Sequence, residues 1–346
     1  MRLLIINPGS TSTKVALFEG LEQKAAETLR HSNEELAPYP TIADQLDFRA
    51  AAVKSFLLRN GDPELSAVMG RGGLLPPMPS GVYEVDNDLK DKLLHPWGQH
   101  ASNLGGLIAA EIAGERGIKA YIADSVTTDE LEPLARYSGT PLIERVSIFH
   151  ALNQKSIARH AARDLGRSYR DINLVVCHLG GGVSVGAHKK GRVVDVNNAL
   201  DGEGPIAPER AGTLPLNGLI DLCYSGAYTK PQVKKLLTGG GGFVALFGTN
   251  SGTKLEEAAI AGDERAILIE KAFCYTVAKE VGRMVAVLKG DVDAIVVTGG
   301  LAYSDRICQL IRSKVEAFAR VLIYPGEDEM KALAEAGAWV LGFSAD

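Results

Sequence analysis

The sequence predicts an α/β fold built from two similar halves. Short apolar runs alternate with segments of helical spacing, a pattern that is typical of α/β proteins. A strand, a turn rich in small residues and a second strand occupy residues 3–20, and the same arrangement recurs at 174–191. The offset of 171 residues is almost half of the 346-residue chain. Two copies are too few for a solenoid, so we expect two domains of similar design. A chance likeness between two β-hairpins is the alternative.

The elements of each half follow from the apolar pattern. The first half begins with a strand at 3–6, a polar turn at 7–14 and a strand at 15–18. In the second half, the apolar run 174–179 leads into the glycines 180–182. Helices are expected at 41–59, 98–116, 151–165 and 263–289.

The last part of the chain contains a third glycine turn. A buried strand beginning at Ala294 ends in Gly299 and Gly300, and a helix is expected from there to about residue 320. A strand at 320–324 then leads into a helix that begins with the acidic residues 327–329. Acidic side chains suit the positive N-terminal end of a helix.

Composition excludes several classes of protein. Glycine accounts for 38 residues, about 11% compared with about 7% on average, but there is no Gly-x-y period and no excess of proline. A net charge of −5 argues against a nucleic-acid partner that needs a basic surface. No apolar run approaches the 18 residues of a membrane helix, so no membrane partner is expected.

The cysteines and the N-terminus indicate a cytoplasmic protein. The apolar run before Asn7, residues 3–6, is only four residues long, shorter than the core of a signal peptide. The four cysteines form no C-x-x-C pair, so we expect small buried side chains in a reducing compartment.

The glycine turns could bind phosphate, because backbone N–H groups without a neighbouring Cβ can converge on an anion. Two of the three turns join strand to strand, which excludes the dinucleotide-binding fingerprint. No Gly-Lys pair exists for a P-loop, and the H-R-D and D-F-G triplets of protein kinases are absent. Each turn alone could be structural. The three together favour polyphosphate binding, with hydroxyls from Ser10, Thr11, Ser12, Ser184 and Thr298.

Two arginines and two histidines stand in settings that suit an anion. Arg71 and Arg210 are flanked by small residues, which would let a planar guanidinium face a carboxylate or phosphate; a solvated surface charge is the alternative. His150 opens an expected helix, and His178 occupies the position that Asn7 holds in the first hairpin. Neither histidine has metal-ligand spacing, and a structural role is the alternative for both.

Asp124 and a four-glycine run complete the candidates. Asp124 follows a short apolar run, where a carboxylate could assist Mg²⁺ or cap a helix. The run 239–242 is interpreted as a flexible connection.

These motifs, in this order, resemble the acetokinase family, and the segment 7–14 is most similar to the opening motif of butyrate and branched-chain fatty acid kinases. The resemblance spans almost the whole chain. The matching segments are Asn7–Lys14, Gly70–Leu74, Ala123–Ser125, Ile148–His150, Cys177–Gly182, Pro208–Gly212, Thr298–Gly300 and Tyr324–Met330.

The resemblance implies a duplicated ribonuclease-H-like fold of the actin, Hsp70 and sugar kinase superfamily, with nucleotide in an interdomain cleft. The N-terminal domain would contain residues 1–150 and 325–346, and the nucleotide-side domain 151–324. The implied activity is reversible transfer of the γ-phosphoryl group of ATP to butyrate or a branched-chain analogue, giving an acyl phosphate and ADP. Mg²⁺ is the implied cofactor, and a homodimer the implied assembly.

The resemblance also implies residue roles. Arg71 and Arg210 would bind the carboxylate and the transferring phosphoryl group, which His150 would stabilise. Asp124, through water, and Asn7 would serve the metal. The implied nucleotide and phosphate ligands are Asn7, Ser10, Thr11, Ser12, Lys14, His178, Gly180, Gly181, Gly182, Gly299 and Gly300. Leu74, Phe149 and Pro205 are suggested for the acyl pocket.

The expected chemistry agrees with these residues. A carboxylate is already ionised at neutral pH, so no strong general base is required. One departure is the segment 301–305, which lacks the glutamate that acetate kinases carry there. This favours the butyrate branch and leaves Asp305 and Glu327 as substitutes. The alternatives are an acetate or propionate kinase, a carbohydrate kinase with Asp124 as base, and a nucleotide-binding regulator without acyl transfer.

Overall fold

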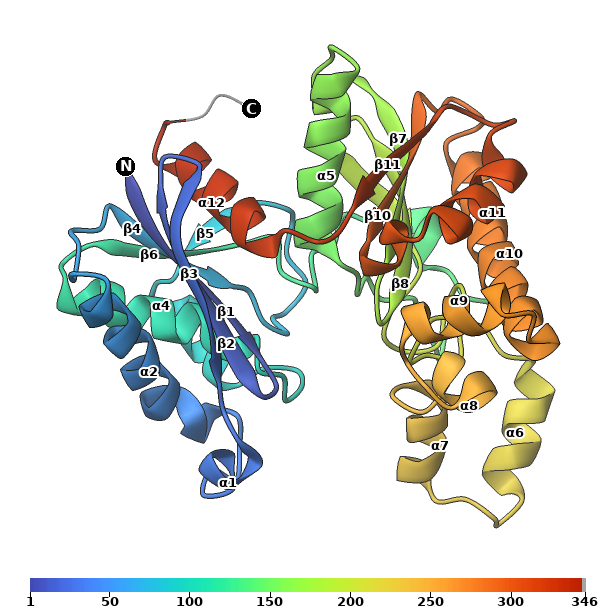
Figure 1. The fold of residues 1–346 in the computed structure, drawn as a ribbon, viewed down its shortest axis with the longest axis horizontal. Helices are drawn as coiled ribbons and strands as arrows, with labels where there is room; N and C mark the ends of the chain where they lie inside the picture. The colour runs from blue at the N-terminus through green and yellow to red at the C-terminus, as the bar shows by residue number, and fades with distance from the viewer. Residues whose placement is uncertain (344–346) are drawn as a thin grey trace. The chain divides into compact units, whose positions relative to one another are not determined.

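A computed structural model describes residues 1–343, which form two compact units (Figure 1). Unit 1 contains residues 1–129, 151–153 and the described chain from Asp328 onward, and unit 2 contains 130–150 and 154–327. The segment 130–150 belongs with unit 2 because its backbone and side chains bond to the strand 192–196: Glu132 N–H donates to Val194 O, for example.

Unit 1 is built on a six-stranded sheet of order β3-β2-β1-β4-β6-β5. The first three strands are antiparallel neighbours, whereas β1, β4 and β6 run parallel. The strands are β1 (Arg2–Gly9), β2 (Ser12–Glu19), β3 (Glu22–Arg30), β4 (Ala67–Arg71), β5 (Val82–Glu84) and β6 (Lys119–Ala123).

Helices cover both faces of this sheet (Figure 1). Apolar side chains of α2 and α4 pack on one face with Leu4 and Ile6 of β1, and α12 packs on the other with Leu3 and Ile5. Alternate side chains of β1 therefore point to opposite faces of the sheet and pack into two separate hydrophobic cores. The helices are α1 (Asn33–Leu36), η1 (Ala43–Gln45), α2 (Leu46–Arg59), α3 (Asn87–Leu94), α4 (Asn103–Glu115) and α12 (Glu329–Val340).

Unit 2 has a five-stranded sheet of order β11-β10-β7-β8-β9. Val175 and Cys177 of β7 pack toward α10, and Leu174 and Val176 pack toward α5. The strands are β7 (Asn173–Leu179), β8 (Val183–Lys189), β9 (Arg192–Val196), β10 (Ala294–Gly299) and β11 (Val321–Pro325).

The helices of unit 2 lie on both sides of its sheet and in an extension between β9 and α10 (Figure 1). The helix α5 (Ala151–Asp164) begins among residues of unit 1 and continues in unit 2. The others are η2 (Pro133–Arg136), η3 (Tyr169–Asp171), α6 (Leu216–Tyr224), α7 (Lys230–Leu237), α8 (Phe243–Phe247), α9 (Gly252–Ile260), α10 (Glu264–Val287), η4 (Gly300–Tyr303) and α11 (Asp305–Val315).

The two sheets confirm the internal repeat. In both, an antiparallel three-stranded meander is extended by two parallel strands on the side of its first strand. The second and third strands of each meander also share a register shift, between Leu17 and Phe18 in unit 1 and between Ala187 and His188 in unit 2. The glycines at the repeated turn, Gly20 and Gly191, both have positive φ.

Two expectations are corrected. The helix expected at 98–116 begins at Asn103, because residues 95–102 form an irregular segment that contains Pro96 and Gly98. Cys223 is exposed, since α6 buries none of its side chains; Cys177, Cys274 and Cys308 are buried as predicted. Within residues 1–343, no helix is long and apolar enough to cross a membrane.

Candidate functional site

In unit 1, Asn7, Arg71 and Glu329 form one polar cluster. Asn7 and Arg71 lie near the carboxyl ends of the parallel strands β1 and β4, and Glu329 is the first residue of α12. The Arg71 guanidinium binds the Glu329 carboxylate in bidentate fashion, with both N–O distances 2.8 Å, and Asn7 Nδ2 donates to Glu329 Oε2 at 2.7 Å. Arg71 is therefore held in a geometry that binds a carboxylate.

Glycines place Arg71 close to α4. A Cβ on Gly70 would overlap the carbonyl of Gly105 in α4, so only glycine permits this approach of strand and helix. A Cβ on Gly73 would overlap the side chain of Asn103, whose Oδ1 accepts from Leu74 N–H at 2.8 Å. The glycines around Arg71 therefore act in packing.

The turn between β1 and β2 is held from inside by Arg49 of α2. Its guanidinium is fully buried and donates to the carbonyls of Gly9, Ser10 and Ser12 at 2.8–3.0 Å. The carbonyls of the turn thus point inward, while the side chains of Ser10, Thr11 and Lys14 are exposed and that of Ser12 is half-buried. Sequence reasoning missed Arg49, because a single arginine in a helix gives no signal of its partner.

Asp124 lies directly after β6, where parallel strands of unit 1 end. Its Oδ1 accepts hydrogen bonds from Ser80 Oγ at 2.6 Å and from Gly81 N–H at 2.9 Å, and its φ of 37° is unusual for a residue with a side chain. No helix begins there, so the capping interpretation is wrong.

The donor set around Asp124 fits magnesium better than a closed metal cage. Within residues 1–343 there is no group of three or more His, Cys, Asp or Glu side chains that could hold a metal. Mg²⁺ typically uses one or two carboxylates and completes its shell with water and phosphate. Asp124 is therefore a suitable carboxylate for an ion that is carried mainly by a phosphorylated ligand.

In unit 2, His150 and His178 stack on one another. The ring centroids are 3.8 Å apart and the planes differ by 12°. His150 precedes α5 and its Nδ1 lies 2.8 Å from Ser184 Oγ, whereas buried His178 on β7 has Nε2 3.2 Å from Glu327 Oε2. That distance suits an ion pair when His178 is protonated, but the two groups are not aligned as a hydrogen bond.

Two of the hydroxyls expected at the glycine turns have internal partners instead. Ser184 is fully buried and contacts His150. The hydroxyl of Thr298 is also buried and donates to Gly326 O at 3.0 Å. The expectation that these two hydroxyls face phosphate is therefore wrong.

The glycine turn 180–182 lies against Arg210. Gly180 N–H donates to Gly182 O at 3.0 Å and closes the turn. A Cβ on Gly182 would overlap Nη1 of Arg210, and one on Gly180 would lie 2.9 Å from His178 Nε2. The absence of side chains at these positions lets the Arg210 guanidinium and the His178 ring approach the turn.

Arg210 is half-buried, and one of its donors, a buried atom, has no partner among the described residues. Its Nη1 donates to Ala199 O, and Ala199 N–H donates to Ile148 O next to the His150 segment. Burial lowers the pKa of Arg210, with Glu209 and Asp201 opposing that effect. Within the described chain, Arg210 Nε is buried and has no hydrogen-bond partner. An unused buried N–H on a cation is a binding group for an anion.

The run 239–242 supports the Arg210 loop, so its interpretation as a flexible connection is wrong. Gly239 N–H donates to Glu209 O at 2.7 Å, and Ala211 N–H donates to Leu237 O at 3.0 Å. A Cβ on Gly242 would overlap the carbonyl of Ala207. The glycines are required for close packing beside Arg210.

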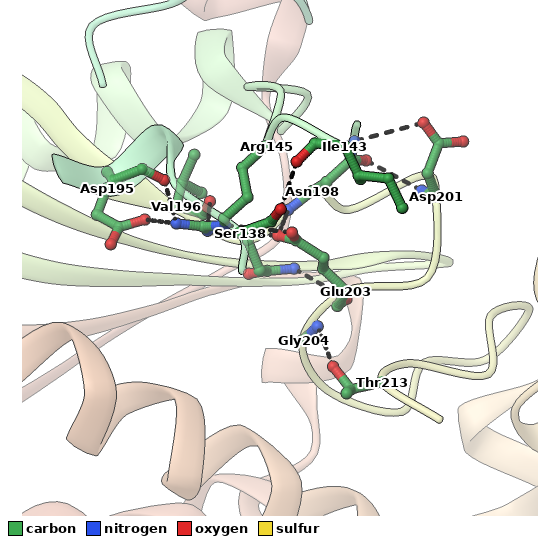
Figure 2. Close-up of polar contacts among 12 residues, drawn as sticks. Ser138, Ile143, Arg145, Asp195, Val196, Asn198, Asp201, Glu203, Gly204 and Thr213 are labelled. Atoms are coloured by element: carbon green, nitrogen blue, oxygen red, sulfur yellow. Dashed lines mark hydrogen bonds and ion pairs between the residues drawn. The ribbon is translucent and has the colours of Figure 1, made fainter. Parts of the chain in front are cut away.

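Arg145 binds the segment that runs from Asp195 to Glu203, as Figure 2 shows. It donates to Asp195 Oδ1 at 3.0 Å, to Val196 O at 3.0 Å and to Glu203 Oε1 at 3.2 Å. Glu203 Oε2 in turn accepts from Asn198 N–H at 2.9 Å. Burial of Arg145 lowers the pKa of its guanidinium. The carboxylates of Glu203 and Asp195 have the larger, opposite effect, so the pKa of Arg145 is raised. Sequence reasoning missed Arg145, because its partners are 50 and 58 residues away.

The remaining candidates divide between the units. Gly299 has φ 94° and a Cβ there would lie 2.5 Å from Leu179 O, whereas Gly300 has open space. Leu74 is half-buried in unit 1, and Phe149 and Pro205 are buried in unit 2. Unit 1 thus holds Asn7, Ser10, Thr11, Ser12, Lys14, Arg71, Leu74 and Asp124, and unit 2 holds Phe149, His150, His178, Gly180, Gly181, Gly182, Pro205, Arg210, Gly299 and Gly300.

Comparison with known proteins gives one family and one fold. Residues 137–330 match the sequence model of the acetokinase family. The fold is similar to that of an acetate kinase from Porphyromonas gingivalis, with a TM-score of 0.81 and 20% identity over 98% of this chain and 99% of that one. A propionate kinase from Francisella tularensis gives a TM-score of 0.78 and 18% identity, covering 97% of this chain and 98% of that one.

A more distant similarity extends to sugar kinases. A ROK hexokinase from Thermus thermophilus gives a TM-score of 0.52 and 13% identity, covering 99% of this chain and all of that one. Together these matches confirm the predicted α/β fold. At such identities they bear on the fold alone.

Proposed function

The chain belongs to the acetokinase family, and on this premise we propose that it transfers the γ-phosphoryl group of ATP reversibly to a short-chain carboxylate, with butyrate or a branched-chain analogue preferred. The products are an acyl phosphate and ADP. The observation that carries this proposal is the buried Nε–H of Arg210 beside the 180–182 turn, which has no partner among residues 1–343.

Phosphoryl transfer to a carboxylate requires positioning and charge neutralisation more than proton transfer. The attacking carboxylate is ionised at neutral pH, so the site needs no strong general base. Arg210 and His150 would neutralise charge on the phosphoryl group, while His178 and the turn 180–182 would hold the nucleotide phosphates. Their pre-set positions minimise reorganisation during transfer.

Unit 1 would supply the acid-binding residues. Arg71 already binds a carboxylate through two N–H groups, so the substrate carboxylate could take the place of Glu329. Asn7 and the turn 10–12, with Lys14, would face phosphate. Mg²⁺, when bound beside Asp124 through water, would screen phosphate charge.

The preference for butyrate rests on the segment 301–305, which carries no glutamate. Leu74, Phe149 and Pro205 are the proposed acyl-pocket side chains, and Gly299 and Gly300 the proposed border of the adenosine site. One methylene in such a pocket is worth about 1–3 kcal/mol, which is enough to order acids by length.

A homodimer is also proposed, and light scattering would measure its mass.

A hydroxylamine trap tests the proposal. The protein is incubated with ATP, Mg²⁺, hydroxylamine and linear or branched acids of two to five carbons, and hydroxamate is measured. We expect the largest kcat/KM with butyrate or isobutyrate. A preference for acetate or propionate would overturn the finer assignment. No hydroxamate with any acid would overturn the proposed activity, and ADP release with a sugar would then favour a carbohydrate kinase.

A further inference from the structure

A chain of hydrogen bonds, buried at its centre and partly buried at its ends, runs from Tyr169 to His150. Tyr169 Oη lies 2.7 Å from His188 Nδ1, and His188 Nε2 lies 2.9 Å from Gln154 Oε1. Gln154 Nε2 lies 2.7 Å from Ser184 Oγ, which lies 2.8 Å from His150 Nδ1. Gln154, Ser184 and His188 are all fully buried.

The orientation of the Gln154 amide is determined by the backbone. Its Nε2 lies 3.1 Å from the carbonyl oxygen of Ser184, which can only accept. The amide oxygen must therefore face His188. A Cβ on Gly186 would lie 2.6 Å from that oxygen, so the glycine of β8 makes room for the amide.

This orientation determines the protonation of His188. Because Gln154 Oε1 can only accept, His188 Nε2 must carry a hydrogen. Burial, and then the charges of Lys155 and Arg159, hold the pKa of His188 well below its ordinary value, so the ring is neutral. Its Nδ1 is then an acceptor and receives the hydroxyl hydrogen of Tyr169.

The same argument continues to His150. One N–H of Gln154 donates to Ser184 O and the other to Ser184 Oγ. The Ser184 hydroxyl already accepts from Gln154, and His150 Nδ1 is its other polar neighbour among residues 1–343. The hydroxyl hydrogen therefore points to His150 Nδ1.

We propose that Gln154, Ser184 and His188 are positioning residues that hold neutral His150 with its hydrogen on Nε2. This inference rests on the proposed function, in which His150 stabilises the transferring phosphoryl group. With Nδ1 occupied as an acceptor, the ring carries its hydrogen on Nε2, and a phosphoryl oxygen is an acceptor that such an N–H can bind. The opposite tautomer would present a lone pair to a negatively charged group and would oppose transfer.

Nitrogen-15 NMR of histidine-labelled protein tests the tautomer directly and needs no activity. The His150 signals are assigned with His150→Asn. In the unsubstituted protein we expect Nε2 protonated and Nδ1 unprotonated. In Ser184→Ala, Nδ1 loses its donor, and we expect the Nδ1–H tautomer to become populated. A His150 that carries its hydrogen on Nδ1 in the unsubstituted protein would overturn the proposal.

Gln154→Glu provides the matched test with nearly the same shape. The carboxylate introduced at position 154 cannot donate to Ser184. We therefore expect the Ser184 hydroxyl to donate to this carboxylate. His150 Nδ1 would then have to carry a hydrogen and donate to Ser184 Oγ. We expect a fall in kcat of about 10- to 100-fold with KM for ATP changed less than about 2-fold. The control is Gln232→Glu, where the side-chain oxygen only accepts, from Thr229 at the start of α7.

A rescue variant separates positioning from packing. Ser184→Thr keeps the hydroxyl and should retain both the tautomer and most of kcat, whereas Ser184→Ala should lose both. An unchanged tautomer in both Ser184→Ala and Gln154→Glu would overturn the relay. If the unsubstituted protein made no acyl phosphate, the proposed function would fail while the NMR result would still stand.

Discussion

An arginine from outside the hairpin lies against the turn in each copy, but the two copies use it differently. In unit 1, Arg49 donates to three turn carbonyls, to Thr13 Oγ1 and to Gln45 Oε1. In unit 2, Arg210 lies over Gly182, bonds to Ala199 O and keeps a buried Nε without a partner among the described residues. Arg49 is fully buried and Arg210 half-buried, and the unsatisfied buried Nε among the described residues is what marks Arg210 as the candidate binding cation and Arg49 as the structural one.

Arg210→Ala should give the largest effect on activity. Loss of a cation that faces the transferring phosphoryl group is expected to reduce kcat about 10³-fold, or ~4 kcal/mol, while ATP binding is largely retained. Steady-state kinetics and nucleotide titration measure the two effects. Arg59→Ala, which removes an exposed arginine, is the control. Turnover within about 3-fold of normal would remove Arg210 from the site.

Arg49→Met should instead reduce stability. The substitution leaves the carbonyls of Gly9, Ser10 and Ser12 without their buried donor, and each group left unsatisfied costs about 1–3 kcal/mol. We expect the free energy of unfolding to fall by about 3 kcal/mol in urea denaturation. Arg210→Met is the matched comparison and should change stability by less than about 1 kcal/mol. Equal losses at both sites would contradict the distinction between the two arginines.

Gly182→Ala should move Arg210 without removing it. The added methyl overlaps the guanidinium, which must shift, and we expect kcat to fall about 100-fold while the free energy of unfolding changes by about 1 kcal/mol. Gly114→Ala is the control, because a methyl there meets nothing within 4 Å. If kcat of Gly182→Ala matched that of the control, the position of Arg210 over the turn would be irrelevant to activity.

The repeated hairpin could be predicted from the sequence because its signals are local. Strand periodicity and the turn glycines Gly20 and Gly191 occupy equivalent positions 171 residues apart. The internal partners of the site could not be predicted in this way. Arg49 reaches a turn 40 residues earlier in the chain, and the stacked pair joins His150 to His178 across two elements. Such contacts depend on how the elements pack, which residue spacing does not encode.

The role of the run 239–242 shows the same limit. Four consecutive glycines are typical of a flexible connection when read alone. In the fold, Gly241 and Gly242 lie too close to Ala211 and Ala207 for any side chain. The four glycines correctly indicated an unusual backbone. The reason they are required is the close packing of this run against the Arg210 loop.

Glu280 provides the smallest and sharpest test of the comparison, because it is a buried charge with an unpartnered atom and no assigned role. Within residues 1–343 its Oε1 has no hydrogen-bond partner, and Oε2 accepts from Arg283 at 3.0 Å. Burial raises the pKa of Glu280 above its ordinary value of 4.5, partly opposed by Arg283. The folded state therefore holds the proton more tightly, and this carboxyl should reduce stability as pH rises above 4.5.

Glu280→Gln should remove that penalty. We expect the free energy of unfolding at pH 7 to rise by about 1 kcal/mol, and its fall as the pH rises above 4.5 to become shallower, with turnover unchanged. Urea denaturation across this pH range and the hydroxamate assay measure both. A loss of turnover would mean that the unpartnered buried atom of Glu280 marks a functional residue, as we propose for Arg210. An unsatisfied buried atom would then indicate function for carboxylates as well as for arginines. A gain in stability without a loss of turnover would mean that an unsatisfied buried atom indicates function only in the cations beside the turns.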